Sequence, residues 1–314
     1  MRILTATAML AVAATAAAGC GNLSFGTHGE TRSYTAPAGI TALKIKGDGS
    51  RVQVTASDTD AIKVSERLRW SNENNKPKVK HATAGDTLTL SAKCAKATMG
   101  TTRCGVSYTV QVPRDIPVEI NSRDGSIVAS GLAGTVKLHS DNGSMEVSDM
   151  NATSASLSSN DGSIRVSGRA ATADLRSDNG SITAAGLTTD RLTARSRDGR
   201  IRLSGSVKTA DLDTHNGSIE AVGLTADRVT AKTRDGGVRL GFVSAPTDVK
   251  ANSENGSIQV ALPGAQSYAI TASTFNGGER IDPAVNQDSG SSHRIKLGAR
   301  DGSITVTPAD QRSW

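Results

Sequence analysis

One six-residue phrase recurs eight times between Ser122 and Ile258. It reads SRDGSI (122–127), SDNGSM (140–145), SNDGSI (159–164), SDNGSI (177–182), SRDGRI (196–201), THNGSI (214–219), TRDGGV (233–238) and SENGSI (253–258). The spacing between successive phrase glycines runs 18, 19, 18, 19, 18, 19 and 20 residues. A fixed period just under 20 residues is typical of solenoids, in which equal turns of chain stack on one another.

Hydrophobic residues alternate on both sides of each phrase. Taking the glycine as position zero, positions +2 and +4 are apolar after the turn, and positions −7 and −5 are apolar before it. Alternation with period two predicts strands with one buried face. We therefore expect an all-β protein, a β-helix-like solenoid of 18–19-residue rungs. A meander of antiparallel hairpins stays open as an alternative, because Asn-Gly is also a strong hairpin signal.

Position −3 is always Ser or Thr, where a hydroxyl can bond the turn backbone or the next layer. Position −1 alternates strictly between Asp and Asn, and we call this column the turn ladder. Its members are Asp124, Asn142, Asp161, Asn179, Asp198, Asn216, Asp235 and Asn255. The alternation marks a 37-residue superperiod, from Gly125 to Gly162 and onward. A rung of one unit would place carboxylates next to amides and avoid like charges side by side. A rung of two units would put Asp and Asn on different edges, and both remain possible.

The N-terminus is predicted to be an export signal. Residues 1–19 hold one Arg and then an uncharged, Ala-rich run that is too short to span a membrane. The run ends Ala17-Ala18-Gly19-Cys20, which resembles a bacterial lipobox and implies acylation of Cys20. This implies an extracytoplasmic protein, lipid-anchored to the cell membrane. The alternative is an ordinary cleaved signal peptide and a free protein. Residues 20–39, rich in Ser, Thr and Gly, are expected to be a tether.

The rest of the chain divides into three parts. Residues 40–117 are expected to form a first rung, with Gly49 at its turn, followed by an antiparallel β insertion. Residues 118–262 form the solenoid repeats, and residues 263–314 a C-terminal cap over the last rung. Cys94 and Cys104 remain as an even pair in an exported chain, which favours a disulfide.

The positive charge is concentrated in the insertion. Residues 63–103 carry nine basic and three acidic side chains, whereas residues 118–262 carry 16 and 17. Such a patch could bind anionic cell-wall polymer or lipid. The candidate residues are Lys76, Lys78, Lys80, Lys93 and Lys96. The alternative is a solvated face that keeps strand edges from pairing. Nucleic acid is not expected as a partner, since no aromatic residues interleave with the basic ones.

No catalytic motif is recognisable, so we predict no enzyme, cofactor or metal. His139 and His215 have no nucleophile at a readable spacing. The row Asp124, Asp161, Asp198 and Asp235 keeps a polysaccharide-cleaving β-helix enzyme open, but glycosidases need one distinct acidic pair rather than a uniform row. Calcium at the Asp/Asn-Gly turns is a further alternative, although known calcium repeats have glycine-rich nine-residue units.

The repeated [S/T]-x-[D/N]-G-S-I-x-V unit behind a lipobox-like signal resembles a bacterial family of unknown function named "putative adhesin". The resemblance covers about residues 40–307 and implies β-strand repeats in an exported or membrane-attached protein. It supplies no catalytic residues. We therefore expect a non-enzymatic structural or interaction module of the cell envelope, whose partners are the membrane through Cys20 and cell-wall polymer or another surface protein. The sequence does not indicate an oligomeric state.

Overall fold

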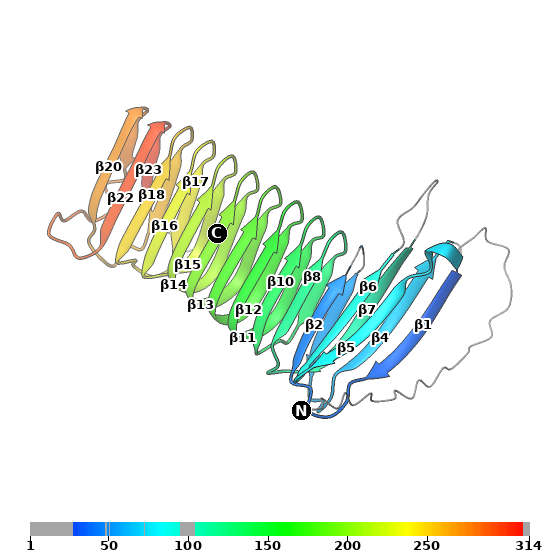
Figure 1. Cartoon of the computed structure of the whole chain (residues 1–314). Helices are drawn as coiled ribbons and strands as arrows, with labels where there is room; N and C mark the ends of the chain where they lie inside the picture. Colours follow the sequence, from blue (N-terminus) through cyan, green and yellow to red (C-terminus); the bar gives the residue numbers. More distant parts are fainter. Residues whose placement is uncertain (1–27, 48, 50, 72, 95–103, 310–314) are drawn as a thin grey trace, which may run out of the picture.

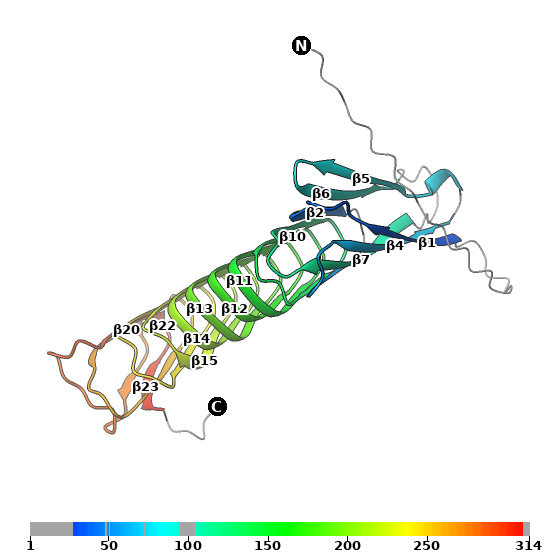
Figure 2. The same ribbon diagram turned by 90° about the horizontal axis from the view of Figure 1, so that it is seen from below.

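The computed structural model describes residues 28–309 except 48, 50, 72 and 95–103. The secondary structure of this part consists of β-strands and one short 3-10 helix, η1 (Glu73–Asn75). No helix in the described part is long and apolar enough to cross a membrane. The strands wind into a long two-faced stack, with the N-terminal strands splayed at one end (Figures 1 and 2). Position −1 of each unit lies at one turn edge of this stack.

We call the strands before and after the Asp/Asn-Gly turn the entry face and the exit face. The entry face contains β2 (Ala42–Gly47), β6 (Thr87–Lys93), β8 (Val118–Ser122), β10 (Thr135–Ser140), β16 (Arg228–Thr233), β18 (Asp248–Ser253), β20 (Ala269–Asn276) and β22 (Arg294–Asp301). The exit face contains β3 (Val52–Ser57), β7 (Cys104–Pro113), β9 (Ile127–Ser130), β15 (Ile219–Thr225), β17 (Val238–Phe242), β19 (Ile258–Leu262), β21 (Glu279–Ile281) and β23 (Ile304–Pro308). Four long strands bend from the exit face to the next entry face: β11 (Met145–Ser159), β12 (Ile164–Ser177), β13 (Ile182–Ser196) and β14 (Ile201–Thr214).

One 18–19-residue unit makes one rung. The strands pair in parallel, with Met145 beside Ile164, Ile164 beside Ile182, and Ile182 beside Ile201. Equivalent residues of successive units are therefore direct neighbours, as the one-unit rung predicts. The 37-residue rung and the antiparallel meander are both wrong for the repeats, because each would separate these residues.

The interior is a set of apolar columns. Ile164, Ile182 and Ile201 are each at most 1% exposed, and Leu157, Leu175 and Leu212 are fully buried on the opposite face. Large residues stand beside small ones, such as Val166 beside Ala184. This exchange of size lets the two faces close on each other without voids.

The corner opposite the turn explains why unit lengths alternate. In the longer units this corner holds Met150, Leu187 or Leu224, and in the shorter units it holds Gly168 or Gly205. The ladder gains one residue there, since Val166 pairs with Ala184 but Gly168 pairs with Leu187. A Cβ on Gly168 would lie 2.4 Å from the Met150 carbonyl oxygen. Large side chain and bare backbone therefore alternate up the corner, and this packing gives the 37-residue superperiod a physical cause.

The N-terminal end departs from chain order. β6 and β7 form a rung outside β2 and β3, pairing with them in parallel although they follow them in the chain. The insertion is antiparallel beyond that rung: β4 (Lys63–Trp70) pairs with β7, and β5 (Lys78–Ala84) pairs with β6. β1 (His28–Thr35) then pairs antiparallel with β4. Residues 20–39, expected to be a tether, thus include a strand of the fold.

The strands of the C-terminal end are also stacked out of chain order. β22 lies between β18 and β20, and β23 lies between β19 and β21. The chain therefore forms the outermost rung first and returns to fill the place beneath it (Figure 1). Tyr268, just before β20, and Val285, between the two passes, are buried at this end of the stack.

Candidate functional site

The Ser/Thr column ties each turn to the rung before it. The Gly143 amide donates to Ser140 Oγ at 2.9 Å, and Ser140 Oγ donates to the Gly125 carbonyl at 3.3 Å. The same two contacts recur at Ser177, with Gly180 N at 3.0 Å and Gly162 O at 3.0 Å. Ser140 and Ser177 are at most 2% exposed, so their hydroxyls satisfy backbone groups that water does not reach.

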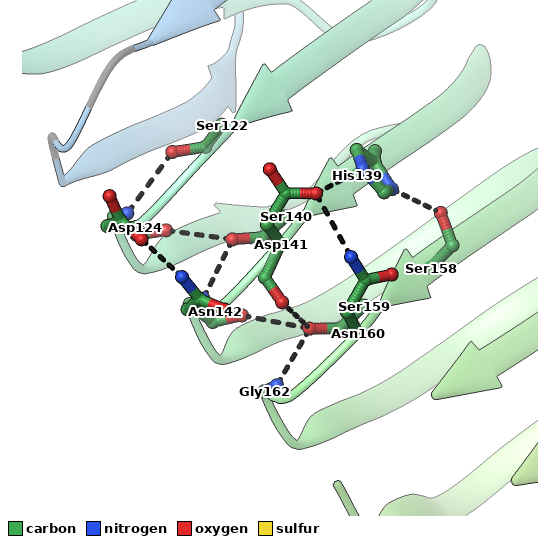
Figure 3. A network of polar contacts seen from close by, with 12 residues as sticks. Ser122, Asp124, His139, Ser140, Asp141, Asn142, Ser158, Ser159, Asn160 and Gly162 are labelled. Carbon is green, nitrogen blue, oxygen red and sulfur yellow. Dashed lines mark hydrogen bonds and ion pairs between the residues drawn. The ribbon is translucent and has the colours of Figure 1, made fainter. Parts of the chain in front are cut away.

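The turn ladder brings its predicted members together along one edge. Asn142 donates to Asp124, Asn179 to Asp161, and Asn216 to Asp198, while Asn255 Nδ2 lies 2.5 Å from Asp235 Oδ1. Figure 3 shows the first of these pairs. Each carboxylate thus has an amide donor from the following rung. No group of three or more metal-binding side chains occurs in the described residues, and the Asp row forms no separate acidic pair. The ladder is built to hold rungs in register.

A histidine network lies on the entry face next to the ladder (Figure 3). His139 Nδ1 is 2.9 Å from Ser158 Oγ, and His139 Nε2 is 3.2 Å from Asp141 Oδ1. Ser158 could not be predicted as a partner of His139, because it lies 19 residues further along the chain on the next rung. A serine, a histidine and an aspartate in a chain suggest acyl transfer. However, His139 and Asp141 are 41% and 42% exposed on a sheet face. The β10 and β11 backbones pair in register here, so they offer no convergent pair of N–H groups to hold an oxyanion. We assign the network to ordering this face.

The predicted basic residues separate into two groups. Lys76 Nζ is 3.2 Å from Glu30 and 4.6 Å from the centre of the Trp70 ring, so it packs against the β1–β4 edge. Lys78 and Lys80 are exposed on β5, and Lys78 lies directly opposite Lys93 of β6. Lys96 is outside the described residues.

One further lysine joins the second group. Lys80 pairs with Ser91, and Ser91 pairs with Lys46 of β2. Lys46 is exposed and precedes the segment in which the charge excess is visible, so sequence reasoning missed it. We call Lys46, Lys78, Lys80 and Lys93 the basic surface. No ion pair to an acidic side chain occurs at these four lysines within the described residues.

Polar residues also occur inside the N-terminal end. Glu66 is 1% exposed, and its Oε1 lies 2.5 Å from His81 Nε2, joining β4 to β5. The ring of Tyr34 stacks on His81 at 4.8 Å. Tyr108 lies beside Glu66, and burial together with the Glu66 charge raises the pKa of the Tyr108 hydroxyl well above its usual range. These polar residues lie among buried apolar residues of the same end, such as Leu68 and Leu90.

Cys94 and Cys104 form the expected disulfide, with their Cα atoms 5.8 Å apart. They lie just after β6 and at the start of β7, so the bond ties the end of β6 to the start of β7. Cys20, the predicted lipidation site, is outside the described residues.

Comparisons with known proteins concern the whole stack. The family model described as Toastrack DUF4097 matches residues 40–205 and again residues 169–307. No curated protein matches the chain. A Bacteroides fragilis structure named "putative adhesin" is 16% identical, with 89% of this chain and 97% of that chain covered and a TM-score of 0.44. A Parabacteroides merdae structure of the same name is 16% identical, with 88% and 95% covered and a TM-score of 0.48. A Parabacteroides distasonis structure named "putative lipid binding protein" is 13% identical, with 88% and 96% covered and a TM-score of 0.47.

Proposed function

The chain belongs to the Toastrack DUF4097 family, and we propose that it is a non-enzymatic, adhesin-like module of the cell surface, anchored by a lipid on Cys20. The stack supplies a rigid rod, and its outer faces supply the contacts. Two acyl chains suffice for stable anchoring, and the anchored end would then be the N-terminal one.

The register of the outward side chains supports this proposal most. On the exit face, Arg165, Arg202 and Arg239 occupy equivalent positions of the third, fifth and seventh repeats. Since rungs stack about 4.8 Å apart, these arginines repeat about every 10 Å along a straight line. Glu146 and Glu220 occupy the same column, and Arg202 pairs with Glu220, so the column presents a regular row of outward charges of both signs. Such a row on a rigid support suits a partner that is itself repetitive.

The packing of the interior also supports a non-enzymatic module. Inward residues pack rung on rung, and the Asp residues of the turn ladder are engaged by amides. A polysaccharide-cleaving enzyme would need one carboxyl held apart from the others to act as a general acid. The residues that the alternative requires are occupied in holding the stack.

Adhesion of coated beads tests the proposal. Beads carrying the mature chain are added to cells of the source organism that lack the protein, and bound beads are counted. We expect binding above that of beads carrying the heat-unfolded chain, and weaker binding when Arg165, Arg202 and Arg239 are replaced by Ser. The matched control replaces Thr183, Thr305 and Gln259, which occupy the same column, by Ser. Equal binding by folded and unfolded chains, or steady release of reducing ends from envelope glycans, would overturn the proposal.

A further inference from the structure

Two lysines of the basic surface lie directly opposite each other, and this arrangement lowers the stability of the fold. Lys78 and Lys93 occupy directly opposed positions of an antiparallel strand pair, where Cβ atoms lie about 5 Å apart. Like charges in this position are destabilising. Lys80 and Lys46 flank the same patch, two strands apart across Ser91.

Several outward charges in the remainder of the stack pair from rung to rung. Arg202 pairs with Glu220 at 3.3 Å, and Lys208 pairs with Asp190 at 3.0 Å. Even Lys44, next to the basic surface, pairs with Glu119 at 2.6 Å. Lys78 and Lys93, by contrast, lie directly opposite each other, and neither forms an ion pair with an acidic side chain in the described part of the chain.

The opposite face of the same end is also basic. Lys63, Arg67 and Arg69 are exposed on the outer side of β4, and no acidic partner of theirs is found in the described part of the chain. The positive charge therefore surrounds the end from which the N-terminal segment departs. Only residues 21–27 separate Cys20 from β1, so this end can stand at most about 28 Å from a lipid on Cys20.

We propose that the basic surface binds the anionic headgroups of the membrane in which Cys20 is anchored. Phosphate groups placed between Lys78 and Lys93 would relieve their repulsion, and Lys46 and Lys80 would contact neighbouring headgroups. The contact holds the rod at a fixed angle to the membrane, whereas a lipid chain alone would leave it free to swing. This inference rests on the proposed anchoring, and it names the partner of the anchored end.

Vesicle flotation tests the inference with the mature chain from residue 20 onward, carrying Cys20→Ser, so that neither an acyl chain nor the apolar residues 3–18 contribute. The chain is mixed with vesicles of phosphatidylcholine, with or without phosphatidylglycerol. We expect flotation only with phosphatidylglycerol, weakened by salt. Replacing Lys78 and Lys93 by Gln should weaken binding about 30-fold, roughly fivefold for each lysine. The control replaces Lys232 and Lys296, exposed lysines of the entry face far along the stack, and should bind as the parent chain does.

Thermal melting supplies a second readout. The Lys78→Gln and Lys93→Gln variant should melt at a higher temperature than the parent, because the opposed charges are gone. Three results would overturn the inference: no dependence on phosphatidylglycerol, equal losses in the two lysine pairs, or binding to a soluble glycerol-phosphate polymer without binding to vesicles. The last result would assign the lysines to wall polymer. Failure here leaves bead adhesion unaffected, since that assay depends on the stack.

Discussion

The Asn276 amide donates to Asp301 Oδ1 at 2.7 Å, although Asn276 precedes Asp301 by 25 residues and lies one rung further out. Gly302 stacks on Gly256, and Gly277 stacks on Gly302. In space, the turn ladder therefore continues from Asn255 to Asp301 and then to Asn276. The Asp/Asn alternation fails along the chain but is restored along the stack, and it matches the inserted rung to its place.

Exchanging the two residues tests this match. Asp301→Asn should cost about 1 kcal/mol, because Asn276 loses a charged acceptor at an exposed site. Adding Asn276→Asp restores one Asn-to-Asp contact in the reverse direction and should recover most of the loss. Urea unfolding of the two single variants and the double variant gives the coupling energy. Strictly additive losses would contradict a pairwise match.

Deleting whole units tests the 37-residue superperiod. Removing residues 162–198 brings Gly205 beside Met150 and Asn216 beside Asp161, so both alternations survive. Removing residues 162–179 instead brings Leu187 beside Met150 and Asp198 beside Asp161. The one-unit deletion should be less stable than the two-unit deletion by about 3 kcal/mol, from overpacking and like-charge contact. A urea midpoint for the two-unit deletion that is equal to or below that of the one-unit deletion would refute the packing account.

Much of this stack could be predicted from the sequence because every repeat has the same pattern of apolar and turn residues. Ile164, Ile182 and Ile201 each stand two residues after the glycine of their phrase, and their burial follows from period-two alternation. The choice between one and two units per rung stayed open, because the Asp/Asn alternation suits either. The decisive fact is the contact of Leu187 with Gly205, which depends on how neighbouring rungs meet.

The ends of the stack were harder to predict for physical reasons. β1 (HGETRSYT) lies at the edge of the sheet and pairs only with β4 among the described strands. Glu30 and Arg32, which lie opposite the buried residues Leu68 and Glu66, are polar, so β1 lacks an apolar alternation. The rung formed by β6 and β7 reads as part of an insertion because local pattern does not say which strand a segment will join. Lys46 and Lys93 come together only through that pairing, so the basic surface is visible only in the fold.

Two glycines of the corner should respond differently to a methyl group. Gly168 has φ +106° and faces the Met150 backbone, whereas Gly186 has φ +63° and open space around it. Gly186→Ala should cost about 1–2 kcal/mol, the usual penalty of a left-handed conformation. Gly168→Ala adds a backbone clash and should cost at least about 3 kcal/mol. Chemical denaturation measures both, and a larger loss at Gly186 would contradict the close approach of rungs at this corner.

The tyrosines predict the behaviour of the protein in alkali. Burial raises the pKa of Tyr268 to about 12, and it also raises the pKa values of Tyr34 and Tyr108. Unfolded tyrosine has a pKa of about 10, so the folded state holds these protons more tightly. Their contribution to stability is complete below pH of about 10 and is lost as the pH rises toward 12.

Near-ultraviolet absorbance of phenolate, followed together with circular dichroism, measures this. We expect little phenolate while the β signal is intact, and a joint change as the chain unfolds. Full ionisation of the tyrosines at pH about 10 with an unchanged β signal would show that the buried sites are open to solvent.

The distance between two outward positions tests the one-unit rung most directly. Val128 and Arg239 are linked through Glu146, Arg165, Thr183, Arg202 and Glu220, so they lie six rungs apart on the exit face. Spin labels replacing Val128 and Arg239, in a chain carrying Cys20→Ser with the disulfide intact, can be measured by pulsed electron–electron resonance. Stacking at about 4.8 Å per rung predicts a narrow distribution near about 29 Å. A distribution near about 14 Å, as two units per rung would give, or one too broad to define a distance, would contradict the rigid stack on which the proposed function depends.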